Sequence, residues 1–158
     1  MSDDASFKDG EKGPLALIAA DAEDLKVVSA MVQDAVLMVS DVNWQPRKRQ
    51  AAFLLNRFRW EDRAEAERLG RAYERVRALL VVDDALRMQA NGIVRDDPEM
   101  VLSLLSITFT EGDTPQLLLT FAGYGEIALK VEAVNLTLKD VTRPYQAPSR
   151  KAPVHPDS

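Results

Sequence analysis

The sequence predicts an α+β fold in which an N-terminal helix packs on a predominantly antiparallel β-sheet with a meander or barrel-like arrangement. One early stretch has helical spacing, and several later stretches are short, rich in β-branched residues and bounded by turn residues. The chain has 158 residues, 46% of them hydrophobic and 28% charged, which suits one globular domain. We expect a flexible acidic leader at 1–13, a single domain at 14–142, and a disordered, proline-rich tail at 143–158.

A helix is predicted from Ala22 to Asp34. Apolar residues such as Leu25 and Val28 recur there at helical spacing, so one face should pack on the core. Asp21, followed by Asp24, is typical of a helix start, because a side-chain oxygen can cap free amide groups and acidic residues suit the first turn.

Two strands joined by a basic turn are predicted at 36–45 and 50–60. Side chains alternate between the two faces of a strand. We predict that the core face of the second strand carries Ala52, Leu54, Asn56, Phe58 and Trp60. The other face changes from apolar to charged along the strand and carries Phe53, Leu55, Arg57, Arg59 and Glu61. Trp60 is then a packing residue, with a ligand-stacking role as the alternative, and Asn56 must find hydrogen-bond partners or orient a ligand.

The remaining chain is read mainly as strands. Residues 62–80 fit a loop or helix to about Arg71 followed by a strand, although the apolar spacing also fits a longer helix. A bend is expected at 83–84 and a turn at 91–92, with further strands in 100–109, 114–121 and 126–138.

Charge is distributed unevenly along the chain. The net charge is -5, yet residues 47–77 carry ten basic and five acidic side chains, and nine of those ten cations are arginine. Arginine suits carboxylates, phosphates and aromatic faces. If the strands with Arg57/Arg59 and Arg75/Arg77 are neighbours, four guanidinium groups share one surface and need neutralising groups. Those groups are either external phosphates or carboxylates, or internal side chains such as Glu61, Glu74 and Glu126.

Several chemistries lack the residues that they require. The chain has no cysteine, and its one histidine, His155, lies in the tail, so thiolate chemistry is excluded and a histidine-based site is not expected within the domain. The pairs Asp83/Asp84 and Asp96/Asp97 lack the spacing of a calcium loop, and Gly123 with Gly125 is typical of a tight turn rather than a dinucleotide site. We therefore predict no catalytic residue, no metal site and no cofactor, and enzymatic activity is not favoured.

Targeting features are also missing from the sequence. The acidic N-terminal residues do not resemble a signal peptide, and no apolar run approaches the length of a membrane-spanning helix. We expect a cytoplasmic protein.

The stretch LLNRFRWE, together with LIAADAEDLKVVSAMVQDAVL, ANGI, VLSLLSITF and FAGYGEIALKVE, resembles one family over roughly residues 15–142. It is a family of short bacterial proteins, familiar from alphaproteobacteria, whose domain has no known function. Its asparagine-arginine-aromatic-arginine-tryptophan motif matches residues 56–60, and the chain departs from the family pattern at the AGYG turn and at Ala128. The resemblance implies a cytoplasmic bacterial protein and supplies no activity.

We predict a non-catalytic binding module that uses an arginine-rich strand surface for an anionic ligand or an acidic protein partner. The candidate ligand-binding residues are Asn56, Arg57, Arg59, Trp60, Arg75 and Arg77. The alternative is a structural or regulatory protein that self-associates as a homo-oligomer through basic-acidic complementarity. Nucleic acid is a less favoured anion because the chain is acidic overall, and a metal-assisted hydrolase is least favoured.

Overall fold

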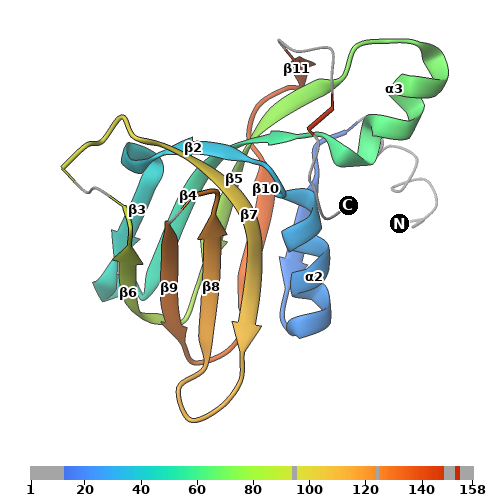
Figure 1. Cartoon of the computed structure of the whole chain (residues 1–158). Helices are drawn as coiled ribbons and strands as arrows, with labels where there is room; N and C mark the ends of the chain where they lie inside the picture. The colour runs from blue at the N-terminus through green and yellow to red at the C-terminus, as the bar shows by residue number, and fades with distance from the viewer. Residues whose placement is uncertain (1–12, 94–95, 124, 148–151, 154–158) are drawn as a thin grey trace.

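The computed structural model describes residues 13–93, 96–123, 125–147 and 152–153 (Figure 1). The predicted leader and most of the predicted tail, including His155, therefore lie outside the described residues. The two α-helices of the described part are α2 (Ala22–Met31) and α3 (Arg63–Leu69). The longer strands are β4 (Gln50–Phe58), β5 (Glu74–Val82), β6 (Ala85–Asn91), β7 (Val101–Thr110), β8 (Gln116–Phe121) and β9 (Glu126–Val131). The shorter strands are β1 (Ala16–Ala19), β2 (Val36–Met38), β3 (Val42–Gln45), β10 (Leu136–Asp140) and β11 (Tyr145–Gln146).

The strands form one antiparallel sheet in the order β1-β10-β5-β4-β2-β7-β8-β9-β6, with β3 paired to β4 and β11 paired to β5. The sheet folds over, so that β6 to β9 face β4, β5 and β10 across a common core (Figure 1). The predicted antiparallel sheet is thus confirmed, and strands dominate the described chain. The sheet is open, with β1 and β6 at its two ends, so the barrel-like arrangement does not extend to a closed barrel.

The side chains of β4 face the opposite way from the prediction. Ala51, Phe53, Leu55 and Arg57 are buried in the interior, whereas Leu54 is only half-buried on the outer side. The prediction was wrong because both faces of this strand are apolar as far as Leu55, so the local pattern cannot identify the inner one. The strand also ends at Phe58, and Trp60 begins a short 3-10 helix instead of continuing the alternation.

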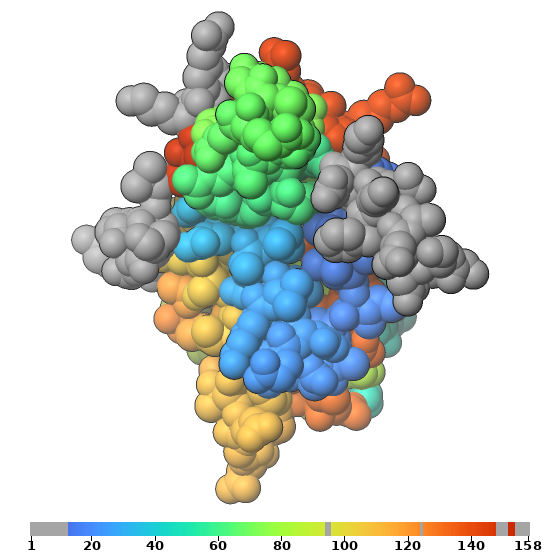
Figure 2. Space-filling view, turned by 90° about the vertical axis from the view of Figure 1, so that its right-hand side faces the viewer, coloured from blue at the N-terminus to red at the C-terminus, as the bar shows by residue number. Residues whose placement is uncertain are grey.

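The N-terminal helix α2 begins as predicted, and its Asp21 side chain accepts a hydrogen bond from the Asp24 amide at 2.8 Å. It ends at Met31 rather than at Asp34. Leu25 and Val28 enter the core, and the helix lies between β1 and β7 beside the open side of the sheet (Figure 1). Figure 2 shows α2 and α3 on the same side of the molecule, with α3 above α2.

Several predicted segments are divided more finely than expected. The stretch 36–45 is two strands, because a 3-10 turn (Val39–Asp41) separates β2 from β3. The stretch 126–138 is also two strands, and β9 and β10 lie far apart in the sheet order. Residues 62–80, predicted as a loop or helix to about Arg71 followed by a strand, form a helix and then a strand, with α3 ending at Leu69 and β5 beginning at Glu74.

The sheet extends past residue 142, the predicted end of the domain, because Tyr145 pairs with Arg75 and Gln146 pairs with Glu74. Within the described part of the chain, none of the helices has the length and apolar character needed to span a membrane.

Candidate functional site

Arg57 lies at the centre of a buried ion network. Its guanidinium group is 0% exposed and binds Asp140 through two hydrogen bonds of 3.0 Å each. It also donates to both carboxylate oxygens of Glu61, at 2.9 and 2.7 Å, and to the Phe58 carbonyl at 3.3 Å. Every nitrogen of this side chain is therefore occupied by the protein itself.

The environment of Arg57 stabilises its charge. Burial, the largest influence, lowers the pKa of Arg57, but the hydrogen bonds and charges of Glu61 and Asp140 together raise the pKa above its ordinary value. Asp140 also accepts a hydrogen bond from the Leu15 amide at 2.8 Å, which ties the start of the described chain to the same network. Arg57 is thus a structural cation, and it offers no donor to a ligand.

Arg59 continues the network toward the surface. Its side chain is 3% exposed and forms ion pairs with Glu74, with Glu61 at 3.7 Å and with Asp62 at 3.8 Å. Asp62 in turn binds Arg71 through two hydrogen bonds of 2.7 and 2.5 Å. Two of the predicted internal neutralising groups, Glu61 and Glu74, therefore act as predicted.

The other predicted residues form a second group on the outer side of the sheet. Arg75 donates to the Asn56 side chain at 2.7 Å and to its carbonyl at 3.1 Å, and Asn56 donates to the Tyr145 hydroxyl. Burial lowers the pKa of Arg75. The predicted need of Asn56 for hydrogen-bond partners is thus met within the protein.

Trp60 packs against neighbouring side chains, which is one of the two roles considered for it. The centroid of its ring lies 4.7 Å from the centroid of the Phe58 ring, and its Nε1 donates a hydrogen bond to the Gln33 carbonyl at 3.0 Å. The guanidinium carbon Cζ of Arg63 lies over the Trp60 ring, 5.9 Å from the ring centroid.

The two arginine-bearing strands are neighbours, but the four guanidinium groups do not share one surface. In the register of β4 and β5, Arg57 lies opposite Val76, whereas Arg77 lies opposite Asn56. Since residues that lie opposite each other share a face, Arg57 points into the core while Arg75 and Arg77 point outward. The predicted crowded surface was therefore wrong. The third suggested neutralising group, Glu126, lies elsewhere and accepts a hydrogen bond from Asn91 at 3.4 Å.

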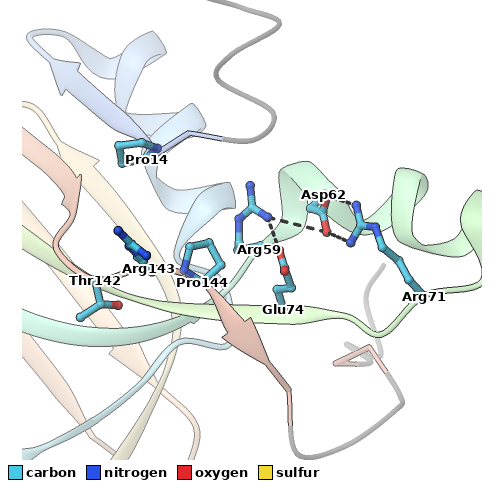
Figure 3. A pocket seen from close by; sticks show the side chains of 8 residues that line it. All are labelled: Pro14, Arg59, Asp62, Arg71, Glu74, Thr142, Arg143 and Pro144. Carbon is cyan, nitrogen blue, oxygen red and sulfur yellow. Dashed lines mark hydrogen bonds and ion pairs between the residues drawn. The ribbon is translucent and has the colours of Figure 1, made fainter.

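An open pocket of about 780 Å³ lies where the buried network reaches the surface (Figure 3). We call it the arginine pocket, and its lining residues are Pro14, Arg59, Asp62, Arg71, Glu74, Thr142, Arg143 and Pro144. Figure 3 shows Arg59 and Arg71 on either side of Asp62, with Arg143 and Thr142 across the pocket from Asp62. The lining therefore holds three arginines and two carboxylates.

Sequence reasoning missed Arg71, Thr142 and Arg143 as members of this pocket. Arg71 is partly exposed, and the hydrogen bond to Asp62 raises the pKa of Arg71 despite slight burial. Arg143 is exposed and makes no ion pair or hydrogen bond with the rest of the described residues. The available signal was an arginine three residues after the end of β10, but its nearness to residues 59–74 depends on β10 pairing with β5.

Of the acidic pairs considered for metal binding, Asp83 and Asp84 hold neighbouring side chains of the protein. Asp83 accepts a hydrogen bond from Gln50 and Asp84 accepts one from Asn135, both at 3.0 Å. Across the described ranges, no group of three or more histidine, aspartate or glutamate side chains is placed to hold a metal ion. Gly123 adopts a φ of 89° at the turn between β8 and β9, where the backbone conformation favours glycine.

Comparison with curated proteins and with solved structures gives no match for this chain. A family model does match, over residues 15–155, and its description is "Protein of unknown function (DUF2948)". This range covers nearly all of the sequence, from the strand before α2 to beyond β11. The predicted membership of a family without known function is confirmed, and the chain belongs to the family of proteins of unknown function DUF2948.

Proposed function

We propose that the domain is a non-catalytic binding module and that the arginine pocket receives the anionic group of a small molecule. One observation carries the proposal: Arg143 and Arg71 both line an open pocket whose cations outnumber its carboxylates. Its volume of about 780 Å³ lies within the range of small-molecule sites, roughly 300–1,000 Å³.

The donors available in the pocket suit a phosphate or a carboxylate. Arg143 presents a planar fork of N–H groups to the solvent, and such a fork matches either anion with two parallel hydrogen bonds. The neighbouring Thr142 Oγ1 accepts a hydrogen bond from the Arg77 amide at 3.1 Å, so its own hydrogen remains available to donate. Adjacent donors of different kinds can thus hold one anionic group.

The buried network beneath the pocket holds the pocket wall in position. Arg59 and Arg71 are fixed by the carboxylates of Glu74 and Asp62, and Arg59 also approaches Glu61, which binds Arg57. A charged side chain that is already held in place loses little freedom when a ligand binds. In this proposal the NRFRW motif supports the site through Arg57 and contributes to its lining through Arg59.

A thermal-shift screen of the full chain at low salt tests the proposal. The small-molecule probes are inorganic phosphate, nucleotides, phosphorylated metabolites and dicarboxylates, and short RNA and DNA are tested beside them. A ligand that binds only the folded state adds about 2.7 kcal/mol of stability at a hundredfold excess over its dissociation constant. We expect at least one of these anions to raise the melting temperature.

Two exposed arginines give a matched pair of variants. Arg143→Gln should weaken binding of the selected anion about tenfold or more, because it removes the charged fork. Arg87→Gln, on β6 at the other end of the sheet, makes the same chemical change away from the pocket and should leave binding unchanged. No shift with any anion, or equal weakening by both variants, would contradict the proposal. A shift seen only with short RNA or DNA, or capture of an acidic protein, would replace the small molecule as the occupant.

A further inference from the structure

The outer side of the central strands is unusually apolar. Along β4 and β5, the interior side chains alternate with outward-pointing Leu54, Leu79 and Val81. Likewise, Leu37 points inward from β2, whereas its neighbours Val36 and Met38 are exposed. An antiparallel sheet with one wet face normally alternates apolar and polar residues.

The strand register joins these side chains into one surface. Leu54 lies opposite Leu79, and Met38 lies opposite Val101 on the next pair of strands. Val36 lies beside Asn56, so the polar group of Asn56 and Arg75 lies between the two apolar pairs. We call this surface the outer apolar face, and its members are Ile18, Val36, Met38, Leu54, Leu79, Val81 and Val101.

Several of these side chains are strongly exposed. Val101 is 62% exposed and Ile18 is 74% exposed. Neither described helix covers the face, because α2 packs toward the core between β1 and β7, and α3 follows the end of β4. Exposed apolar side chains on several neighbouring strands are typical of a surface that another layer covers.

Charged residues at the two sides of the outer apolar face have opposite signs. Arg77 and Lys139 lie on the side of β5 and β10, and both are exposed. Asp97 and Glu99 lie on the other side, next to Met38 and Val101, where the Val39 amide donates to the Met100 carbonyl at 3.0 Å. A two-fold axis in the plane of the face therefore places the basic side of one copy on the acidic side of another.

We propose that a second copy of this chain covers the outer apolar face and forms a symmetric dimer. Such a dimer requires a self-complementary surface, and the outer apolar face offers an apolar centre with complementary charged sides. The proposal does not depend on the arginine pocket. It also differs from self-association through the whole arginine-rich stretch 47–77, since Arg57, Arg59 and Arg75 are held by groups of their own chain and the basic side used here is Arg77 with Lys139.

Sedimentation velocity and light scattering of the full chain over micromolar to millimolar concentrations give the first test. We expect a concentration-dependent species of twice the mass of one chain. Val101→Lys should weaken the dimer about tenfold or more, because it places a cation on the acidic side of each copy, where the Arg77 and Lys139 side of the other copy must pack. Val27→Lys is the matched control, since Val27 is 51% exposed on α2 away from the face, and it should leave the dimer unchanged.

Charge reversal tests the second copy against any other occupant. Lys139→Glu and Glu99→Lys should each weaken the dimer, and the two together should restore it, because the reversed charges meet again across the two-fold axis. A monomer at all concentrations, or a dimer that Val101→Lys leaves intact, overturns the proposal. Failure of the double variant to restore the dimer overturns the two-fold pairing. Circular dichroism of each variant separates a lost interface from a lost fold.

Discussion

Arg57 shows how a charged residue can hold a β-sheet interior together. Its guanidinium group is fully buried, and the carboxylates of Glu61 and Asp140 bind it from two directions. Replacing a whole buried ion network by apolar side chains can leave the free energy of unfolding nearly unchanged. Removing only one member lowers it strongly, because the remaining buried charges lose their counter-charge.

We predict that Arg57→Met destabilises the protein by about 3–5 kcal/mol, because it leaves the buried Asp140 carboxylate without its cation and Glu61 with Arg59 at 3.7 Å as its remaining partner. Urea unfolding followed by circular dichroism measures the effect. Arg77→Met is the control on the neighbouring strand, where the exposed side chain should make a change of less than about 0.5 kcal/mol. Equal effects of both substitutions would show that the network around Arg57 is not specially required.

Glu61 makes the stability depend on pH. Burial, the largest influence, raises the pKa of Glu61, but the hydrogen bonds and charge of Arg57 lower the pKa below the ordinary value of 4.5. A carboxyl group with a lowered pKa in the folded state contributes stability above its unfolded pKa. That contribution is lost as the pH falls through the folded pKa.

Stability should therefore fall in the acid range, and Glu61→Gln should reduce this dependence by removing the titrating group. Urea midpoints measured from pH 3 to pH 7 check the slope. The exposed Glu132→Gln serves as the control. An unchanged slope in Glu61→Gln would mean that other carboxyl groups dominate acid unfolding.

The individual site residues were only partly predictable from the sequence. The shared arginine surface expected from the excess of arginine in 47–77 was wrong, but Glu61 and Glu74, two of the internal groups considered as neutralising partners, do pair with Arg57 and Arg59. The burial of Arg57 was not predictable, because it depends on Asp140, which lies 83 positions away in the sequence.

At the scale of single elements, α2 is the clearest case of local control. The Asp21 side chain accepts a hydrogen bond from the Asp24 amide at 2.8 Å. The Asp24 side chain in turn accepts one from the Ala20 amide at 3.1 Å. The first contact satisfies an amide group that the first helical turn leaves unpaired, and the second satisfies the amide group just before the cap.

We predict that Asp21→Ala costs about 1 kcal/mol, which is typical for the loss of a helix N-cap. The exposed Glu23→Ala, two positions later, removes an acidic side chain of the same first turn but no cap, and should cost less. Thermal unfolding of the two variants gives the comparison, and a larger loss in Glu23→Ala would argue against the capping role.

Element types were predictable where a local signal decides them, and element partners were not. The start of α2, the turns at 83–84 and 91–92, and the strand after Arg71 all follow from local caps, turn residues and spacing. The split of 126–138 into β9 and β10 was missed, because one side chain pattern fits both strands although each pairs with a different part of the sheet.

At the scale of the whole molecule, one core joins both layers of the sheet. Buried side chains from α2, from β4 and β5, and from β7 to β9 belong to a single apolar cluster. The two tryptophans report on different ends of β4, because Trp44 pairs beside Ala51 and Trp60 follows its other end.

We predict that Trp44→Phe and Trp60→Phe variants, each observed through the remaining tryptophan, lose fluorescence and circular dichroism signals at the same urea concentration. A single core should unfold in one cooperative step. Separate midpoints for fluorescence and circular dichroism within one variant would show that the two ends of β4 belong to independently unfolding units.

The arginine pocket forms only when distant segments of the chain come together. Its lining joins Pro14, residues 59–74 and residues 142–144, which come together because β10 pairs with both β1 and β5. No local pattern in any of these three segments indicates the others.

The place of β1 in the sheet also constrains how the chain folds during its synthesis. In the sheet, β1 pairs with β10, and Leu15 is bonded to the Asp140 carboxylate 125 positions later. The ribosome synthesises the residues of β1 first, so β1 cannot pair in the native way until the residues of β10 have been translated. The same delay applies to Arg57, whose Asp140 counter-charge arrives with β10. We therefore expect that a nascent chain stalled before residue 136 is protease-sensitive, and that the native sheet is completed only after β10 has left the exit tunnel.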